Sequence, residues 1–324
     1  MRIFVLGRSE FLYNSAVLLS SSYNICGIIT AAPSPEFAVT EKDFKKLADE
    51  INCPFMFTTG ISEREIEFIK STFPDICISV NWVSILRDNV LSLFPYGVLN
   101  AHFGNLPAYR GNAVINWAIL RGEKSIAITI HKMLSGEVDT GPVYIKEFMD
   151  IDQHTEIGHI VEFCKSRTPI LFLEVIRGIE SGKLKPLEEK DIISFRCYPR
   201  LPEYSKINWN ASAEEIHALI RSSSRPYRGA YSYLKINDEI KKVYIWKSRV
   251  VEINTKDIGV AGHVIKNDKL NGESWVYTGK GIIALLKVQY EGGEEFAPGY
   301  KWKSIRMHFG FDAEDELYRI YRKK

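Results

Sequence analysis

The sequence predicts an α/β fold in which a Rossmann-like domain with a parallel sheet precedes a smaller, OB-like antiparallel β-barrel domain. Over the first 150 residues, short apolar runs alternate with amphipathic stretches of helical spacing, which is typical of a parallel sheet covered by helices. After residue 197 the pattern changes to brief strand-like runs separated by Gly, Asn and Asp, which favours a small barrel. The two patterns place one domain at residues 1–203 and the other at 204–324.

The expected strands of the first domain coincide with runs of β-branched and aliphatic residues. These runs cover residues 2–7, 23–30, 54–57, 75–80, 97–103, 125–133 and 141–148. Helical spacing covers residues 10–21, 41–51, 62–73, 84–94, 112–120 and 154–182. We expect Pro169 to kink or split the last of these helices. Parallel sheets of this kind bind ligands beyond the carboxyl ends of their strands, and His102 lies at one of those ends.

The second domain follows a stretch with two prolines and mixed charges at residues 197–209. A helix is expected to begin after Ser212, because Ser212 and Glu215 have the spacing of a capping box. Strand-like runs then occupy residues 229–236, 240–246, 250–253, 259–265, 274–279 and 281–290. Their close spacing predicts the antiparallel barrel.

Composition and charge describe an ordinary globular protein. Hydrophobic residues make up 45% and charged residues 25% of the chain, as in typical folded domains. The 42 basic and 40 acidic residues give a formal charge of +2, which argues against a protein that coats DNA. We expect a cytoplasmic protein without membrane contact, because no apolar run has the length of a membrane span or of a signal-peptide core.

No metal site or disulfide framework is expected. The five cysteines lie far apart without a CxxC pair, at Cys26, Cys53, Cys77, Cys164 and Cys197, which is not the spacing of a zinc site or a disulfide scaffold. His102, His131 and Asp139 could approach one another, but they lack the HxxxH or HExxH spacing of metal-binding motifs.

The chemistry is expected at Asn100, His102 and Asp139. Asn100 and His102 point to the same face of a strand, because successive side chains alternate. A core histidine with an asparagine that caps the next turn would explain the pair alone. Asp139, in a glycine-flanked loop between two strands, adds a carboxylate that could orient the imidazole. Since an asparagine amide can donate to an oxyanion, the three side chains together suggest acyl transfer without a nucleophilic side chain.

The segment NAHFGNLPAYRG, followed by Asp-Thr-Gly 37 residues after the histidine, resembles the folate-dependent formyltransferase family. The shared positions are Asn100, His102, Leu106, Pro107, Tyr109, Arg110, Gly111 and Asp139. The opening FVLGRSEF and the later INWNASAEEIHALIRSSSRPYRGAYSYL are also similar to that family, so the resemblance covers nearly the whole chain. Two features depart from it: Phe103-Gly104-Asn105 replaces a serine or glycine-serine pair, and the loop before Asp139 is one residue longer.

The resemblance implies a one-carbon transferase in which Asn100, His102 and Asp139 are catalytic. The implied formyl donor is N10-formyltetrahydrofolate, which leaves as tetrahydrofolate. Its pterin would lie between two loops, in contact with Ser84, Ile85, Leu86, Ser135, Gly136, Glu137 and Val138, with Asn112 nearby. Ile85 and Leu86 could equally be core residues of a helix.

The resemblance is greatest to N-formyltransferases that act on nucleotide-linked amino-deoxysugars, so we expect a UDP- or dTDP-sugar acceptor made for a surface glycan, and a homodimer. The residues expected to bind this acceptor are Arg8, Ser9, Asn81, Trp82, Phe103, Tyr109, Arg110 and Lys132. Arg110 could instead be a structural clamp of the Tyr-Arg-Gly turn. We expect no DNA partner and disfavour tRNA, because the stretch TAAPSPEFAVTEKDFKK lacks the arginines that would grip its phosphates. The alternatives are a methionyl-tRNA formyltransferase and a non-catalytic folate-binding protein.

Overall fold

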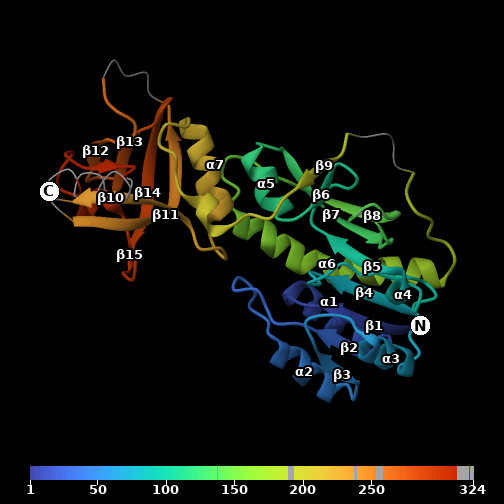
Figure 1. Ribbon diagram of the computed structural model, residues 1–324. Helices are drawn as coiled ribbons and strands as arrows, with labels where there is room; N and C mark the ends of the chain where they lie inside the picture. The colour runs from blue at the N-terminus through green and yellow to red at the C-terminus, as the bar shows by residue number, and fades with distance from the viewer. Residues whose placement is uncertain (137, 189–192, 237–238, 253–257, 312–320, 322–324) are drawn as a thin grey trace. The chain divides into compact units, whose positions relative to one another are not determined.

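The computed structural model (Figure 1) describes residues 1–136, 138–188, 193–236, 239–252, 258–311 and 321. Its contacts divide the chain into two compact units. The first comprises residues 1–115, 124–151 and 159–199, and the second comprises residues 116–123, 152–158 and 200–324. The boundary predicted after residue 203 stays a prediction, because two short earlier segments also belong to the second unit.

The first unit contains a seven-stranded sheet in the order β3-β2-β1-β4-β5-β7-β8. Its strands are β1 (Arg2–Gly7), β2 (Asn24–Thr30), β3 (Phe55–Phe57), β4 (Ile76–Val80), β5 (Val98–His102), β7 (Ser125–Lys132) and β8 (Val143–Asp150). The strands from β3 to β5 are parallel, as predicted. The expectation of parallel strands does not extend to β7 and β8, which are antiparallel to their neighbours. The chain between β5 and β7 stays at the carboxyl end of β5 instead of crossing the sheet, so β7 runs back along it.

The helices of the first part of the chain are α1 (Glu10–Ser20), α2 (Glu41–Glu50), α3 (Glu63–Ser71), α4 (Asp88–Leu91), α5 (Val114–Leu120) and α6 (Ile157–Glu180). The helix expected at residues 84–94 forms only in α4, because Ile85 is 67% exposed and does not supply the buried face of a helix. The expected break at Pro169 does not divide α6. Apolar residues on both sides of the proline, including Ile160 and Phe172, are fully buried and hold both halves in place.

A two-stranded parallel sheet, which the sequence patterns did not suggest, joins β6 (Tyr109–Gly111) to β9 (Phe195–Cys197). Three-residue strands are too short for a recognisable alternation of apolar and polar residues. This pairing fixes the Tyr-Arg-Gly turn that follows β5.

The second unit contains a curled antiparallel sheet in the order β12-β13-β14-β11-β10-β16, with β15 beside β14. Its elements are the 3-10 turn η1 (Pro202–Ser205), α7 (Ala213–Ser223), β10 (Ala230–Ile236), β11 (Glu239–Val251), β12 (Val264–Asp268), β13 (Glu273–Tyr277), β14 (Ile282–Tyr290), β15 (Glu295–Phe296), α8 (Pro298–Lys301) and β16 (His308–Phe309). A bridge between His263 and His308 links the two ends of the sheet. The α/β class and the antiparallel half-barrel agree with the predicted fold.

Two local features of the second unit follow from its sequence. Ser212 caps α7, accepting a hydrogen bond of 3.2 Å from the N–H of Glu215, and the capping box forms as predicted. The strands expected at 240–246 and 250–253 are one strand, β11. The polar residues between them form register irregularities near Lys247 rather than a turn, so the strand continues.

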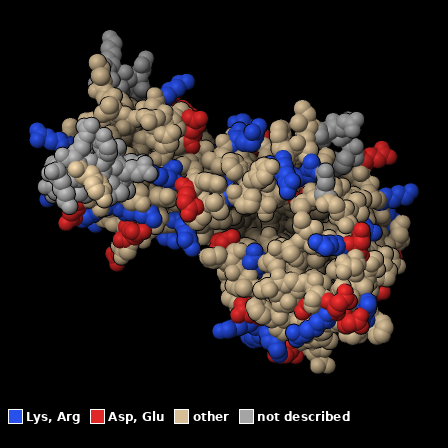
Figure 2. All heavy atoms as spheres, viewed as in Figure 1, with Lys and Arg blue, Asp and Glu red and all other residues tan. Residues whose placement is uncertain are grey.

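Acidic and basic side chains are interspersed on the face shown in Figure 2, consistent with a formal charge of +2. In the described part of the chain, no helix combines the length and apolar character needed to span a bilayer.

Candidate active site

Asn100 and His102 lie on β5, two residues apart, so their side chains share one face of the sheet. They are 9% and 7% exposed. On the neighbouring strand β7, His131 pairs with Asn100 and Thr129 pairs with His102. The polar pair is therefore buried beside a second polar pair at the carboxyl end of β5.

The carboxylate of Asp139 reaches these side chains from the loop between β7 and β8. Its Oδ2 lies 3.4 Å from Nδ1 of His102 and accepts a hydrogen bond of 2.9 Å from the N–H of Gly111. Asp139 has a φ of 59°, a left-handed conformation that aspartate adopts more readily than most residues. The structure thus brings together the three residues that the sequence suggested for acyl transfer.

His102 is held in one tautomer by its surroundings. Its Nε2 lies 2.7 Å from the carbonyl oxygen of Tyr109, and because a carbonyl only accepts, Nε2 carries the hydrogen and donates it. The other ring nitrogen, Nδ1, faces the carboxylate of Asp139. A neutral His102 therefore presents a free electron pair at Nδ1, where a proton could be received next to a negative charge.

Gly104 makes this arrangement possible. A Cβ atom at this position would lie 2.7 Å from Nε2 of His102 and 2.8 Å from the carbonyl oxygen of Tyr109, which is closer than real Cβ atoms come to their neighbours. Thr129 secures the turn by donating a hydrogen bond of 2.7 Å to the carbonyl oxygen of Gly104. The presence of glycine at position 104 is thus explained by the lack of space for a side chain beside His102 and Tyr109.

Burial and neighbouring charges act against each other on both pKa values, and both pKa values end below their ordinary values. Burial lowers the pKa of His102, and the negative charge of Asp139 opposes this only in part. Burial raises the pKa of Asp139, but His131, His102 and the N–H of Gly111 outweigh it and lower the pKa to about 2. At neutral pH, the carboxylate is ionised and the imidazole of His102 is neutral.

His131 is a fourth member of the cluster that the sequence analysis considered only as a metal ligand. Nδ2 of Asn100 donates a hydrogen bond of 3.0 Å to Nε2 of His131. Oδ1 of Asp139 lies 3.5 Å from the same nitrogen, and this contact with His131 helps to lower the pKa of Asp139. The alternation of side chains along β7 could not identify this residue, because it does not reveal which residue of β7 stands opposite Asn100.

A half-open pocket of about 80 Å³ lies beside the cluster. Its lining combines apolar side chains with two members of the cluster: Ile85, Leu86, His131, Met133, Leu134, Gly136, Val138 and Asp139. Four of the residues predicted to contact a pterin, namely Ile85, Leu86, Gly136 and Val138, thus surround one hollow. Ser84, Asn112 and Ser135 do not line it, and Glu137 lies outside the described residues.

Several residues predicted to bind the acceptor have structural hydrogen bonds. Arg8 donates 3.0 Å to the carbonyl oxygen of Asn81 and 2.8 Å to that of Ala32, tying together loops at the carboxyl ends of the strands. Ser9 is fully buried and accepts a hydrogen bond of 3.2 Å from the side chain of Asn81. Their role in binding an acceptor stays a prediction.

Four further residues predicted to bind the acceptor follow β4 or β5 and make contacts within the fold. Phe103 packs against Phe11 with ring centroids 4.6 Å apart. The carbonyl oxygen of Tyr109 accepts a hydrogen bond from His102. Arg110 pairs with Arg196 of β9 through the backbone. Trp82 packs against the core of the first unit.

Lys132 is separated from the cluster. It pairs with Leu99, and its side-chain stem covers Gly97, before the start of β5. The structure therefore does not bring Lys132 to the carboxyl end of β5, where His102 lies.

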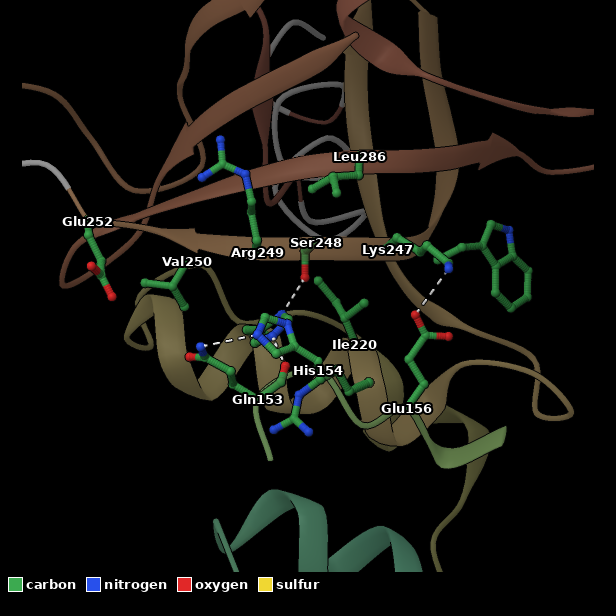
Figure 3. Close-up of a pocket in the computed structure, with 13 residues that line it drawn as sticks. Gln153, His154, Glu156, Ile220, Lys247, Ser248, Arg249, Val250, Glu252 and Leu286 are labelled. Carbon is green, nitrogen blue, oxygen red and sulfur yellow. Dashed lines mark hydrogen bonds and ion pairs between the residues drawn. The ribbon is translucent and has the colours of Figure 1, made fainter. Parts of the chain in front are cut away.

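A larger cavity, of about 280 Å³, lies within the second unit (Figure 3). His217 is one of its lining residues; its Nδ1 lies 2.9 Å from the hydroxyl of Ser248, and its Nε2 donates a hydrogen bond of 2.9 Å to the carbonyl oxygen of Gln153. Figure 3 shows Lys247 and Glu156 facing each other at 3.5 Å. Both nitrogens of His217 are thus occupied by hydrogen bonds within the second unit.

Two family models match the chain. The model described as formyl transferase covers residues 15–176, and the model described as formyl transferase, C-terminal domain, covers residues 201–304. The two matches fall on the two parts of the chain that the sequence patterns distinguish.

Relatives that are similar over most of the chain are named methionyl-tRNA formyltransferase. A methionyl-tRNA formyltransferase of Clostridium novyi (strain NT) is 30% identical over 90% of this chain and 93% of its own. One from Carboxydothermus hydrogenoformans is 29% identical over 93% of this chain and 97% of its own. One from Clostridioides difficile (strain 630) is 32% identical over 77% of this chain and 81% of its own.

Solved structures share the fold at lower identity. An N-formyltransferase of Helicobacter canadensis, in complex with folinic acid and dTDP-3-aminofucose, superposes with a TM-score of 0.65 at 18% identity, covering 88% of this chain and 98% of its own. HypX from Aquifex aeolicus gives a TM-score of 0.57 at 17% identity over 92% of this chain and 46% of its own.

The expectation of a nucleotide-sugar acceptor, with tRNA disfavoured, is wrong. It is overturned by relatives 28–32% identical that are named methionyl-tRNA formyltransferase, whereas the sugar enzymes share only the fold at 16–19% identity. The physical argument failed because RNA phosphates can be neutralised by basic residues anywhere on a surface, so one loop without arginine excludes nothing. This chain belongs to the formyl transferase family.

Proposed function

We propose that this formyltransferase transfers the formyl group of N10-formyltetrahydrofolate to the amino group of methionyl-tRNA. The co-substrate N10-formyltetrahydrofolate leaves as tetrahydrofolate. The single observation that supports the acceptor is the name methionyl-tRNA formyltransferase, which the similar relatives share. In the Clostridium novyi enzyme, for example, the similarity covers 90% of this chain and 93% of the relative's chain.

The pocket beside Asp139 is the proposed donor site. Its apolar walls, including Leu86, Met133 and Val138, suit the faces of a flat ring. Its volume of about 80 Å³ is below the range of typical ligand pockets. A pterin would therefore extend from the hollow into the open space at its mouth, and the formyl group would point toward Asn100.

Asn100 is proposed to stabilise the oxyanion of the reaction. When a neutral amine attacks the formyl carbon, negative charge develops on the formyl oxygen. An amide fixed in a nearly dry site can donate to that oxygen without rearranging during the reaction. The hydrogen bond to His131 fixes Asn100 through one N–H of Nδ2, which leaves the second N–H of the same nitrogen for the substrate.

His102 and Asp139 are proposed to manage the protons. The attacking nitrogen loses one proton, and the folate nitrogen gains one as its bond to the formyl carbon breaks. Nδ1 of His102 can receive a proton because its partner Nε2–H is committed to Tyr109. Asp139, ionised at neutral pH because its pKa is about 2, then stabilises the imidazolium.

The test is a transfer assay with purified protein, N10-formyltetrahydrofolate and initiator tRNA charged with methionine. We expect formylmethionyl-tRNA to form, with tetrahydrofolate released in equal amount. Uncharged tRNA is the control for the amine, and the Asn100→Ala variant is the control for the site. Formylation of a dTDP-linked aminosugar without formylation of methionyl-tRNA would contradict the proposal.

A further inference from the structure

Ser79 is a buried serine beside Asn100 that the proposed mechanism does not use. It lies on β4 and pairs with Asn100 of β5 and Leu6 of β1. Paired residues of adjacent strands point to the same face, so Ser79 and Asn100 share a face. On the opposite side of Asn100, His131 occupies the equivalent position on β7. Asn100 thus stands in a row between a serine and a histidine.

The Ser79 hydroxyl has an unusual environment. The residue is fully buried, and its hydroxyl has no hydrogen-bond partner among the described residues. Buried hydroxyls are normally paired, and leaving one unpaired costs about 1–3 kcal/mol. An unpaired buried hydroxyl next to a reaction centre is a candidate for a bond that forms only with substrate present.

Asn100 offers the matching unpaired group. Within the described part of the chain, its side chain forms a hydrogen bond from Nδ2 to His131. The side-chain oxygen Oδ1 therefore remains available as an acceptor. Neighbouring strands are about 4.8 Å apart, so rotation of the two side chains can bring this oxygen within reach of the Ser79 hydroxyl.

We propose that Ser79 is a positioning residue that donates its hydroxyl hydrogen to Oδ1 of Asn100 when the formyl donor is bound. This inference rests on the proposed role of Asn100 in formyl transfer. Accepting a hydrogen bond at Oδ1 polarises the amide and makes its N–H groups stronger donors. Ser79 on one side and His131 on the other then hold the amide plane, and the second N–H of Nδ2 is directed at the formyl oxygen.

A role of this kind has a signature that a structural serine does not share. In the free protein, Ser79→Ala removes an unpaired buried hydroxyl, so the variant should melt a few degrees higher than the parent protein. With the donor bound, the same variant lacks one hydrogen bond. It should therefore bind 10-formyl-5,8-dideazafolate, a stable carrier of the N10 formyl group, about fivefold more weakly, and kcat/KM for the donor should fall at least as much.

Two further variants complete the experiment. Ser79→Thr keeps the hydroxyl and should restore donor binding. Ser15→Ala is the matched control, because Ser15 is also fully buried but its hydroxyl already donates 2.7 Å to the carbonyl oxygen of Phe11. This control should leave donor affinity and kcat/KM unchanged.

The proposal is overturned if Ser79→Ala melts below the parent protein or binds the donor analogue with unchanged affinity. Donor binding is measured without any acceptor. A protein that binds the analogue but formylates no methionyl-tRNA would therefore contradict the proposed acceptor, and the comparison of the Ser79 variants could still be made.

Discussion

His102 uses its two ring nitrogens for different tasks, and the division follows from its neighbours. The carbonyl of Tyr109 takes the hydrogen of Nε2, at 2.7 Å, and the ionised carboxylate of Asp139 lies 3.4 Å from Nδ1. Asn100 is fixed in the same way by His131. At the scale of single residues, Asn100 and His102, which we propose as reacting groups, are therefore each oriented by a hydrogen bond to a neighbouring residue.

Removal of either proposed catalytic side chain should slow transfer without unfolding the protein. Loss of one oxyanion donor typically lowers kcat by about 10²–10³, so we expect at least this loss for Asn100→Ala and for His102→Ala. Steady-state kinetics with methionyl-tRNA measures the effect, and circular dichroism checks that the fold is retained. A His102→Ala enzyme with the activity of the parent protein would rule out this histidine as the proton acceptor.

The imidazole of His102 should titrate at unusually low pH. Burial lowers its pKa from the ordinary value of 6.5, and Asp139 counteracts this. Replacing Asp139 by Asn removes the negative charge, so the pKa should fall further. NMR titration of the His102 ring measures both midpoints. A midpoint above 6.5 in the parent protein, or a rise in Asp139→Asn, would contradict the assigned environment. Because the folded-state pKa lies below the unfolded one, this histidine also reduces stability as the pH falls below about 6.5.

His131 should matter for rate through its hydrogen bond to Asn100, beyond its place in the lining of the proposed donor pocket. In His131→Ala the amide of Asn100 loses its fixed partner, and a hydrogen bond of this kind contributes about 1 kcal/mol. We expect kcat to fall about fivefold, in addition to any rise in KM for the donor from the loss of a side chain that lines its pocket. Glutamine at position 131 can accept from the same N–H and should recover part of the rate, whereas a purely packing role would be served equally well by leucine.

At the scale of elements, the site depends on how β5 ends. The strand is buried through His102, and the chain then turns at Gly104 so that the Tyr109 carbonyl returns to the imidazole. This returning segment forms β6, which begins at Tyr109 and is held by its pairing with β9. The hydrogen bond between His102 and Tyr109 thus depends on the end of β5, on Gly104 and on the pairing of β6 with β9.

Gly104→Ala should therefore reduce activity strongly, although it adds only one methyl group. The added Cβ would lie 2.7 Å from Nε2 of His102 and 2.8 Å from the Tyr109 carbonyl oxygen, so one of the two must move. We expect kcat to fall more than tenfold, because a misplacement of about 1 Å can cost 10²-fold, together with a lower melting temperature. Gly60→Ala is the matched control: its Cβ would meet nothing within 4 Å, and it should behave like the parent protein.

Sequence patterns predicted the elements that are long and periodic. The strands around β1, β4 and β5 and the capped start of α7 at Ser212 form where the apolar runs and the capping box indicated. The helix expected at residues 84–94 was wrong because its apolar residues line the pocket beside Asp139 or pack into the core without forming a helical face. The break expected in β11 was wrong because register irregularities absorb the polar residues there.

The candidate site was predictable only in part, because some of its residues are recognised only from the residue opposite them in the sheet. Asn100 and His102 stand out because polar residues are rare in a buried strand, and Asp139 stands out in its glycine-flanked loop. His131 and Ser79 did not, since a histidine or serine within a strand gains meaning only from the residue opposite it. Strand register depends on tertiary structure.

At the scale of the whole molecule, the chain consists of two compact units. The first holds the proposed catalytic cluster and donor pocket. The second, a half-barrel with α7, contains its own cavity. The match of the C-terminal family model to residues 201–304 shows that the second unit is a part of the family plan rather than an unrelated addition.

The most direct test of the account compares tetrahydrofolate release by the parent protein and by Asn100→Ala, each with the donor and methionyl-tRNA. Release by the parent protein should require the charged tRNA and match the formylmethionyl-tRNA formed, and the variant should be slower by at least about 10²-fold. Equal rates in the two proteins, or release that leaves the methionyl amine unmodified, would show that the buried cluster on β5 does not carry out this transfer.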